Sequence, residues 1–136
     1  MTDSHESASG STQRVRGAFS LSRLPSLSLI AMIGWLLGRY KRRRVRGNSM
    51  LPTLEPGQEV LIKPLAGAAR NAINPGDLLY VQHPLDSSRQ IIKRCSHWEG
   101  TKVWLVGDNS AESTDSRSYG ALPAKFILGK LICTFP

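Results

Sequence analysis

Short runs of aliphatic and aromatic residues alternate with clusters of turn residues from residue 47 to the end of the chain. Runs that are rich in Val, Ile, Leu and aromatic residues and bounded by Gly, Pro, Asn and Asp are typical of β-strands. No part of this region repeats apolar residues at the spacing of a long amphipathic helix. The pattern therefore predicts a mainly β domain, with strands at residues 59–65, 77–83, 89–98, 102–107 and 126–135.

The first 46 residues follow a different pattern. Residues 1–23 are polar, rich in Ser and basic towards their end, and we expect a disordered basic tail. Residues 24–38 are apolar and uncharged, which predicts an N-terminal apolar helix. This stretch is shorter than the roughly 20 residues that a spanning helix needs. It has the length of the apolar part of a signal peptide, but no small-residue cleavage site follows it.

Three arrangements remain open for residues 24–46, which comprise the apolar stretch and a basic flank. They are a short membrane anchor, a helix lying in the membrane interface, and an ordinary helix packed on the folded body. The sequence thus divides the chain into a disordered tail (1–23), an apolar or membrane-associated segment with its basic flank (24–46), and a folded domain (47–136).

The formal charge of +8 is concentrated ahead of the folded domain. Residues 1–46 contain nine of the 18 Lys and Arg residues and two acidic residues, whereas residues 47–136 carry a net charge of +1. A nucleic-acid-binding domain would more often carry a basic face on the fold itself, so we expect no nucleic-acid partner. An anionic membrane surface is the better partner for a basic arm beside an apolar segment.

Basic residues flank the apolar stretch on both sides, three before it and six after it. If the stretch spans a bilayer, the positive-inside rule places the C-terminal domain in the cytoplasm. The sequence therefore predicts a membrane-associated protein with its folded domain in the cytoplasm, and a soluble cytoplasmic protein remains the alternative.

The cysteines and histidines carry no pattern of a cofactor site. Cys95 and Cys133 have no CxxC partner, and the three histidines are scattered. Two buried thiols in a reducing compartment are a simpler interpretation than a disulfide. No group of residues has metal-ligand spacing, so we expect neither a metal nor another cofactor.

Ser49 lies in a turn-like segment just ahead of the first predicted strand. A serine hydroxyl becomes an effective nucleophile only when a base removes its proton. The nearby Gly and Pro favour a defined turn that exposes the hydroxyl and aims backbone N–H groups at a developing oxyanion. Taken alone this signal is weak, because most serines in such turns are only turn residues. The expected contacts to substrate or oxyanion come from Gly47, Asn48, Met50 and Pro52.

Lys93 lies within the predicted strand 89–98, where it shares one face with Ile91 and Cys95. Burial between apolar neighbours lowers a lysine pKa because it disfavours the charged form. A lysine base near neutral pH needs a fall of about 3 units from about 10.4, at a cost of roughly 4 kcal/mol. A lysine whose stem packs while its ammonium reaches water is the commoner arrangement, so the strand alone does not establish a base.

The segment 107–120 is a polar loop after the strand 102–107. A 14-residue loop in so small a domain tends to be functional. Ser113 has a hydroxyl that can hold the Lys93 amine, and Asp115 and Arg117 can form an ion pair that braces the loop. Asp108 and Asn109 are suited to a tight turn after the strand.

Together the three segments resemble the type I signal peptidases of peptidase family S26 over about residues 45–132. This combination in this order is highly specific. The resemblance implies a compact antiparallel β fold like that of the repressor proteases, with Ser49 as nucleophile, Lys93 as its base and the Ser49 backbone N–H in the oxyanion hole. The matching residues are Ser49-Met50 with Pro52-Thr53-Leu54, Asn74-Pro75-Gly76-Asp77, Lys93-Arg94, Gly107-Asp108-Asn109, Ser113, Asp115-Ser116-Arg117 and Gly120.

The sequence departs from the family pattern in two places. Many bacterial members carry a Ser two positions before the nucleophile, where this chain has Gly47, so the second oxyanion donor is not identified. Those enzymes also insert a sizeable domain between the Lys-Arg strand and the Gly-Asp-Asn segment. Here only about a dozen residues separate Arg94 from Gly107, and we expect a minimal catalytic domain.

Among compact members, the sequence looks most like the nickel-type superoxide dismutase maturation proteases, which are thought to remove a short N-terminal extension. The resemblance lies in residues 39–64, 74–84 and 91–95. The mitochondrial inner-membrane peptidases are also similar, over residues 103–123. A general leader peptidase is a further alternative. The expected partner is therefore a precursor protein with an N-terminal pro-segment.

Two other function classes are less consistent with the sequence. A self-cleaving regulator of the repressor type uses the same dyad, but residues 1–46 do not resemble a helix-turn-helix domain. Its cleavage site should also precede the nucleophile, whereas the only Ala-Gly pair, at residues 66–67, follows Ser49. A non-catalytic protein that binds membranes or nucleic acid through the basic arm would not need the three motifs.

Overall fold

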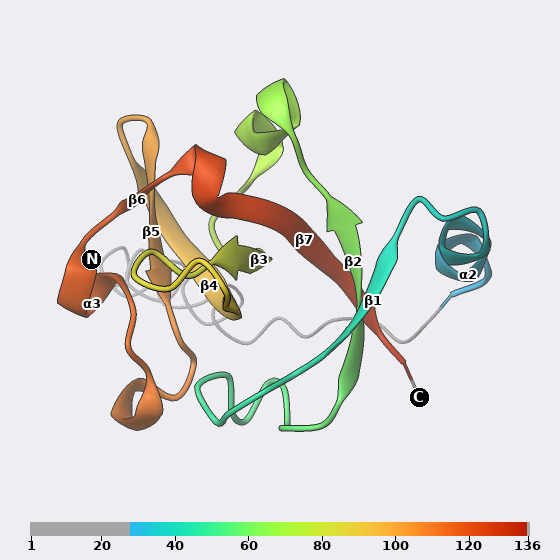
Figure 1. The fold of residues 1–136 in the computed structure, drawn as a ribbon, viewed down its shortest axis with the longest axis horizontal. Helices are drawn as coiled ribbons and strands as arrows, with labels where there is room; N and C mark the ends of the chain where they lie inside the picture. Colours follow the sequence, from blue (N-terminus) through green and yellow to red (C-terminus); the bar gives the residue numbers. More distant parts are fainter. Residues whose placement is uncertain (1–27, 136) are drawn as a thin grey trace, which may run out of the picture.

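The fold is an antiparallel sheet that curls around two apolar cores (Figure 1). The computed structural model describes residues 28–135, so the tail 1–23 and the start of the apolar stretch, 24–27, lie outside the described residues. Within that range seven strands follow the order β1-β2-β7-β3-β4-β5-β6, which confirms the mainly β prediction. The strands are β1 (Lys41–Arg44), β2 (Glu59–Pro64), β3 (Leu78–Gln82), β4 (Gln90–Glu99), β5 (Lys102–Val106), β6 (Leu122–Pro123) and β7 (Ile127–Thr134).

Short helical turns join these strands. Figure 1 shows α2 beside β1 at one end of the molecule, and β5, β6 and α3 at the other. The helical elements are α2 (Leu29–Leu36), η1 (Gly67–Ala72), η2 (Ser110–Glu112), α3 (Ser116–Tyr119) and η3 (Ala124–Phe126).

The five predicted strands correspond to β2, β3, β4, β5 and β7. The central strand β7 alternates between buried and partly exposed residues along its whole length, as the period of a strand requires. It pairs with β2 on one side and β3 on the other, so its backbone groups are satisfied on both edges. Register shifts in the β2–β7, β3–β7 and β4–β5 pairs bend the sheet.

β1 is a strand that the apolar pattern did not predict, because the sequence placed these residues only in the basic flank of the apolar segment. Its four residues, Lys-Arg-Arg-Arg, are all exposed and show no apolar alternation. Backbone pairing with β2 holds it, from Lys41 opposite Ile62 to Arg44 opposite Glu59. Charged side chains on an edge strand discourage pairing with another chain.

The helix α2 is shorter than the predicted apolar stretch and packs on the outer side of β2 and β7. Ser28 caps its N-terminus by accepting a hydrogen bond from the Ala31 N–H, 3.2 Å. Ala31 is buried with Leu61 and Cys133, while Leu29 and Ile30 are largely exposed. No helix of residues 28–135 is long and apolar enough to cross a membrane.

The strand β4 contributes to two apolar clusters at once. Cys95 belongs to the cluster under β3, β5 and β7, and Ile91 packs against it. Ile92 belongs to a second cluster, formed by the segment before β2 together with β2, β3 and β7. Because successive side chains of β4 point to opposite faces, apolar clusters anchor the strand from both sides. This packing fixes the backbone at Lys93.

Candidate active site

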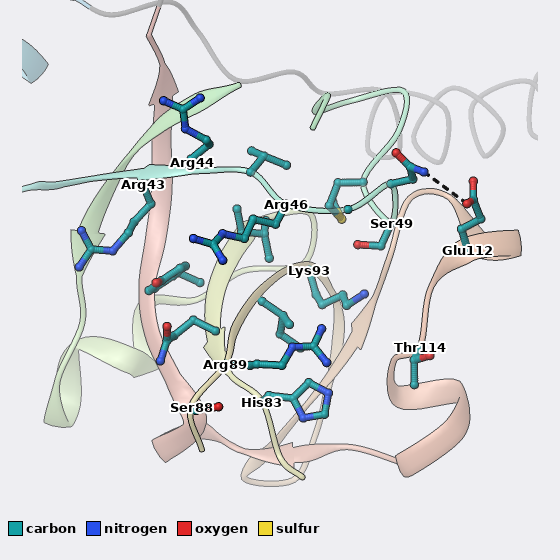
Figure 2. Close-up of a pocket in the computed structure, with 18 residues that line it drawn as sticks. Arg43, Arg44, Arg46, Ser49, His83, Ser88, Arg89, Lys93, Glu112 and Thr114 are labelled. Carbon is teal, nitrogen blue, oxygen red and sulfur yellow. Dashed lines mark hydrogen bonds between the residues drawn. The ribbon is translucent and has the colours of Figure 1, made fainter. Parts of the chain in front are cut away.

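A pocket of about 810 Å³ lies between the segment that follows β1 and the first half of β4 (Figure 2). Residues 43–50 line one wall, and residues 88–93 line the other. Glu112 and Thr114 close it from the loop after β5. The pocket contains both Ser49 and Lys93, which come from opposite walls.

Ser49 is held in a tight turn whose apolar side is buried. Gly47 has φ of +73°, a conformation that glycine adopts without strain. Met50 is 2% exposed and fixes the turn to the second apolar cluster. The Asn109 N–H donates to the Ser49 carbonyl oxygen at 2.8 Å. Among the described residues nothing accepts a hydrogen bond from the Ser49 N–H.

The other residues expected at the oxyanion or substrate have different placements. Asn48 lines the pocket, and its side chain donates to Glu112 at 3.4 Å, the dashed line in Figure 2. Gly47 also lines the pocket, whereas Met50 lines it only at the base, because its side chain is buried in the core. Pro52 follows a cis peptide bond and is exposed outside the pocket lining.

Lys93 is buried, with 4% of its surface exposed. Its Nζ donates to Ser113 Oγ at 2.9 Å, which is the contact expected from the sequence. Burial lowers the Lys93 pKa, and the positive charges of Arg117 and Arg89 lower it further, while Asp115 acts in the opposite direction. In Figure 2 the Lys93 side chain extends into the pocket towards the side on which Ser49 lies. The amine therefore has the environment of a proton acceptor.

Asp115 organises the loop behind Lys93. Its buried carboxylate accepts hydrogen bonds from Ser113 Oγ and the Gly107 N–H, both at 2.8 Å, and from Arg117 Nε at 2.9 Å. Burial acts to raise the Asp115 pKa, but the hydrogen bonds from Arg117, Gly107 and Ser113 hold it well below its usual range. A charged Asp115 thus orients the Ser113 hydroxyl, which in turn orients the Lys93 amine.

Gly107 allows the two halves of the site to approach each other. A Cβ at this position would collide with the Ser113 side chain and would lie 2.8 Å from the Ser49 carbonyl oxygen. Both serine segments therefore pack directly on the backbone of Gly107. A glycine is required here because of this close approach.

A second ion pair, which sequence reasoning missed, ties Ser49's segment to β4. Arg94 is 7% exposed and binds Asp108 through two hydrogen bonds of 2.8 Å. Thr53 Oγ1 donates to the same carboxylate at 2.5 Å. The sequence predicted only a turn role for Asp108. An arginine between Ile92 and Cys95 in a strand is a usable signal, because a buried guanidinium needs an acidic partner.

The described residues contain no group of three or more His, Cys, Asp or Glu side chains arranged to hold a metal ion. Cys95 and Cys133 are both buried and free, and burial raises the pKa of both thiols, that of Cys95 to about 11. Within residues 28–135 the pocket therefore offers a hydroxyl, an amine whose pKa is lowered by burial, and a backbone N–H beside the hydroxyl.

Comparison with known proteins agrees with this chemistry. Residues 21–104 and 97–135 match the family described as signal peptidase, peptidase S26. The chain is 35% identical to mitochondrial inner membrane protease subunit 1 of Schizosaccharomyces pombe, over 68% of this chain and 71% of that protein. It is 32% identical to the Arabidopsis thaliana mitochondrial ATP-independent inner membrane protease subunit 1a, over 65% and 66%. The human mitochondrial inner membrane protease subunit 1 is 32% identical, over 62% and 63%.

Proposed function

The chain belongs to the S26 family of signal peptidases and is a serine-type peptidase, and we propose that Ser49 is its nucleophile and Lys93 its general base. One observation supports these roles above all: a buried lysine amine with a lowered pKa is held by Ser113 in the pocket that also contains Ser49. Asp115 and Arg117 position Ser113, and Asp108 links the segment of Ser49 to β4 because it binds both Thr53 and Arg94.

In the proposed reaction, the neutral Lys93 amine takes the proton of the Ser49 hydroxyl as Ser49 Oγ attacks the peptide carbonyl carbon. The negative charge that develops on the carbonyl oxygen is stabilised by the Ser49 N–H. The protonated Lys93 then gives its proton to the leaving amine, which departs and leaves an acyl group on Ser49. Water, deprotonated by Lys93, attacks this ester and releases the acid product and the free hydroxyl.

The substrate is proposed to be a precursor protein from which an N-terminal segment is removed. The names of the relatives favour the mitochondrial inner-membrane type, one of the alternatives drawn from the sequence, over nickel superoxide dismutase maturation. The latter stays a prediction. Co-expression with a nickel superoxide dismutase precursor, followed by mass measurement of its N-terminus, distinguishes the two: an unprocessed precursor excludes that assignment.

We further propose that the protein acts at a membrane surface. The helix α2 leaves Leu29, Ile30 and Leu36 exposed, and the exposed basic strand β1 follows it in the chain. An apolar face beside cationic side chains suits a bilayer that contains anionic lipid. The cytoplasmic placement of the folded domain remains a prediction from the charges that flank the apolar stretch.

The peptidase assignment is tested with a library of peptides made from a digested proteome, with new N-termini read by mass spectrometry. The full chain should generate cleavages that Ser49→Ala and Lys93→Met do not. Ser88→Ala is the matched control, because Ser88 lines the same pocket without contacting Lys93 and should retain cleavage. Cleavage retained by Ser49→Ala or Lys93→Met, with each variant folded, would exclude the proposed dyad.

The same preparation tests the self-cleaving alternative. Intact mass of the purified chain over several days should not change. A shortened chain that Ser49→Ala does not produce would instead favour a regulator that cleaves itself.

A further inference from the structure

The pocket is lined by four arginines, three on the wall that leads to Ser49 and one just before β4: Arg43, Arg44, Arg46 and Arg89. Figure 2 shows Arg46 and Arg89 on opposite walls. Within residues 28–135 none of the four forms an ion pair with a carboxylate. The arginines that stabilise the fold do have such partners: Arg42 with Glu59, Arg94 with Asp108, and Arg117 with Asp115.

Negative charge within the pocket is scarce. Glu112 is the one carboxylate among its lining residues, and it accepts hydrogen bonds from the side chains of Asn48 and Asn109. The walls thus combine four guanidinium groups with one carboxylate that is already engaged. A concave site lined by one sign of charge concentrates ligands of the opposite sign.

The cationic lining continues away from Ser49. A second cavity of about 360 Å³ shares Arg43, Tyr80 and Gln90 with the first and is also lined by Lys41. The two cavities therefore adjoin each other along β1, and together they are called the groove. An extended peptide advances about 3.3 Å per residue, so a groove bounded by residues 41–49 accommodates roughly five or more substrate residues.

We propose that this groove selects substrates with Asp or Glu side chains within about five residues of the cleaved bond, on one side of it. The inference rests on the proposed peptidase function and names its substrate class. Arg46 and Arg89 act as specificity residues, because their guanidinium groups form charge-assisted hydrogen bonds with carboxylates. A peptide is favoured over a lipid surface because these charges line a recess around Ser49, whereas a bilayer contacts an outer face.

Cleavage specificity provides the first test. In the peptide library, sites cut by the full chain should be enriched in Asp and Glu on one side of the bond. Arg46→Gln with Arg89→Gln should reduce the preference for acidic over neutral sites about tenfold, the factor expected for one hydrogen bond to a charged group. The ratio is the proper readout, since loss of Arg89 also alters the Lys93 pKa equally for all substrates. Lys102→Gln removes an exposed charge outside the groove and should preserve the preference.

Direct binding provides a second test that needs no catalysis. Full-length Ser49→Ala is titrated with a fluorescent decapeptide of alternating Glu and Ala, with its Gln-Ala counterpart, and with phosphatidylglycerol vesicles. The Glu peptide should bind about tenfold more tightly than the Gln peptide, and the two arginine substitutions should reduce this difference. Vesicle binding should be unaffected by those substitutions.

The outcomes separate this inference from the function on which it rests. Cleavage without acidic enrichment, or equal binding of the two peptides, overturns the acidic specificity and leaves the peptidase intact. If the arginine substitutions weaken vesicle binding but leave Glu-peptide binding unchanged, the cationic lining binds lipid. That result also overturns the acidic specificity. If the full chain and Ser49→Ala produce the same cleavages, the peptidase function is overturned. The inference about its substrate is then overturned as well, even if the Glu peptide binds.

Discussion

The two walls of the groove are built in opposite ways. Residues 41–50 form an exposed, cationic wall whose charged side chains face solvent and whose order depends on the buried anchors Val45 and Met50. The wall formed by β4 and the loop after β5 instead buries three charged groups and gives each a hydrogen-bond partner: Lys93, Arg94 and Asp115 are at most 7% exposed.

This difference follows from what each wall has to do. A lysine base must lose its proton easily, which requires a dry environment and a fixed amine, and burying it is tolerable only if neighbouring polar groups are satisfied. A surface that receives substrate must keep its charges free until the substrate arrives. The exposed wall therefore offers Arg43, Arg44 and Arg46 to a ligand, while β4 and the loop after β5 use Arg94 and Arg117 in internal ion pairs.

Among these substitutions, Asp115→Asn on the buried wall should cause the largest loss of stability. The substitution removes the charge that Arg117, Ser113 and the Gly107 N–H all bind, inside a fully buried site. We expect a loss of about 2–4 kcal/mol in unfolding free energy, because hydrogen bonds to a buried charge are lost. Urea denaturation measures this loss. Asp86→Asn should change stability far less, because within residues 28–135 this exposed side chain accepts hydrogen bonds only from Ser88, and an equal change would show that burial does not set the size of the effect.

The pH dependence of stability tests whether the buried wall lowers the pKa of Lys93. Its pKa is lower in the folded chain than the ordinary value of 10.5, so between these two pKa values the unfolded chain binds a proton that the folded chain does not. Stability relative to Lys93→Met should therefore rise with pH in that interval, by at most about 1.4 kcal/mol per pH unit. Urea denaturation of both chains from pH 6 to pH 10 gives the difference. A constant difference would mean that Lys93 keeps an ordinary pKa. The same protonation should reduce kcat/KM as the pH falls through the Lys93 pKa.

Thr53→Val removes one hydrogen bond that links the two walls. Thr53 Oγ1 binds Asp108, which also holds Arg94, so the variant loosens Ser49's segment from β4. We expect a loss of about 1 kcal/mol in stability. We also expect a fall in kcat with little change in KM, because the positioning of Ser49 matters most in the transition state. Thr101→Val, in the exposed turn after β4, is the control and should alter neither quantity.

The smallest effect on stability should come from Arg46→Gln on the exposed wall. Arg46 is exposed and has no ion pair within the described part of the chain. Its loss should change the unfolding free energy by less than about 0.5 kcal/mol, as is usual for surface positions, while altering the preference for acidic peptides. Denaturation and the peptide library together check this pair of outcomes. A loss of stability as large as that of Thr53→Val would show that Arg46 is structural.

The five long strands were predictable because their apolar residues are either continuous or alternate with polar ones. β1 was not predictable, since four exposed basic residues carry no such signal and only the backbone partners on β2 make them a strand. The apolar stretch predicted a helix, and α2 occupies Leu29–Leu36, a shorter part of it. The reason is local: Gly38 has a positive φ, and the chain then turns back to pair with β2.

The candidate site shows the same division between local and non-local information. The pairing of Asp115 with Arg117 was expected because the two residues are neighbours in one polar motif. The Ser113–Lys93 hydrogen bond was expected because a buried lysine amine needs a polar partner and the polar loop offers a hydroxyl. The role of Arg94 with Asp108 and Thr53 was not expected, since these residues come from three separate segments.

The sequence by itself determined the fold class, the family and the residue types that the chemistry needs, because these depend on the order of apolar, turn and reactive residues along the chain. Only the tertiary structure decided which side chains lie buried and which face the groove, and hence that Lys93 has a lowered pKa while Arg46 and Arg89 remain without carboxylate partners in residues 28–135. The physical reason is that desolvation and pairing are set by all the segments that surround a group, and these come together only when the sheet curls.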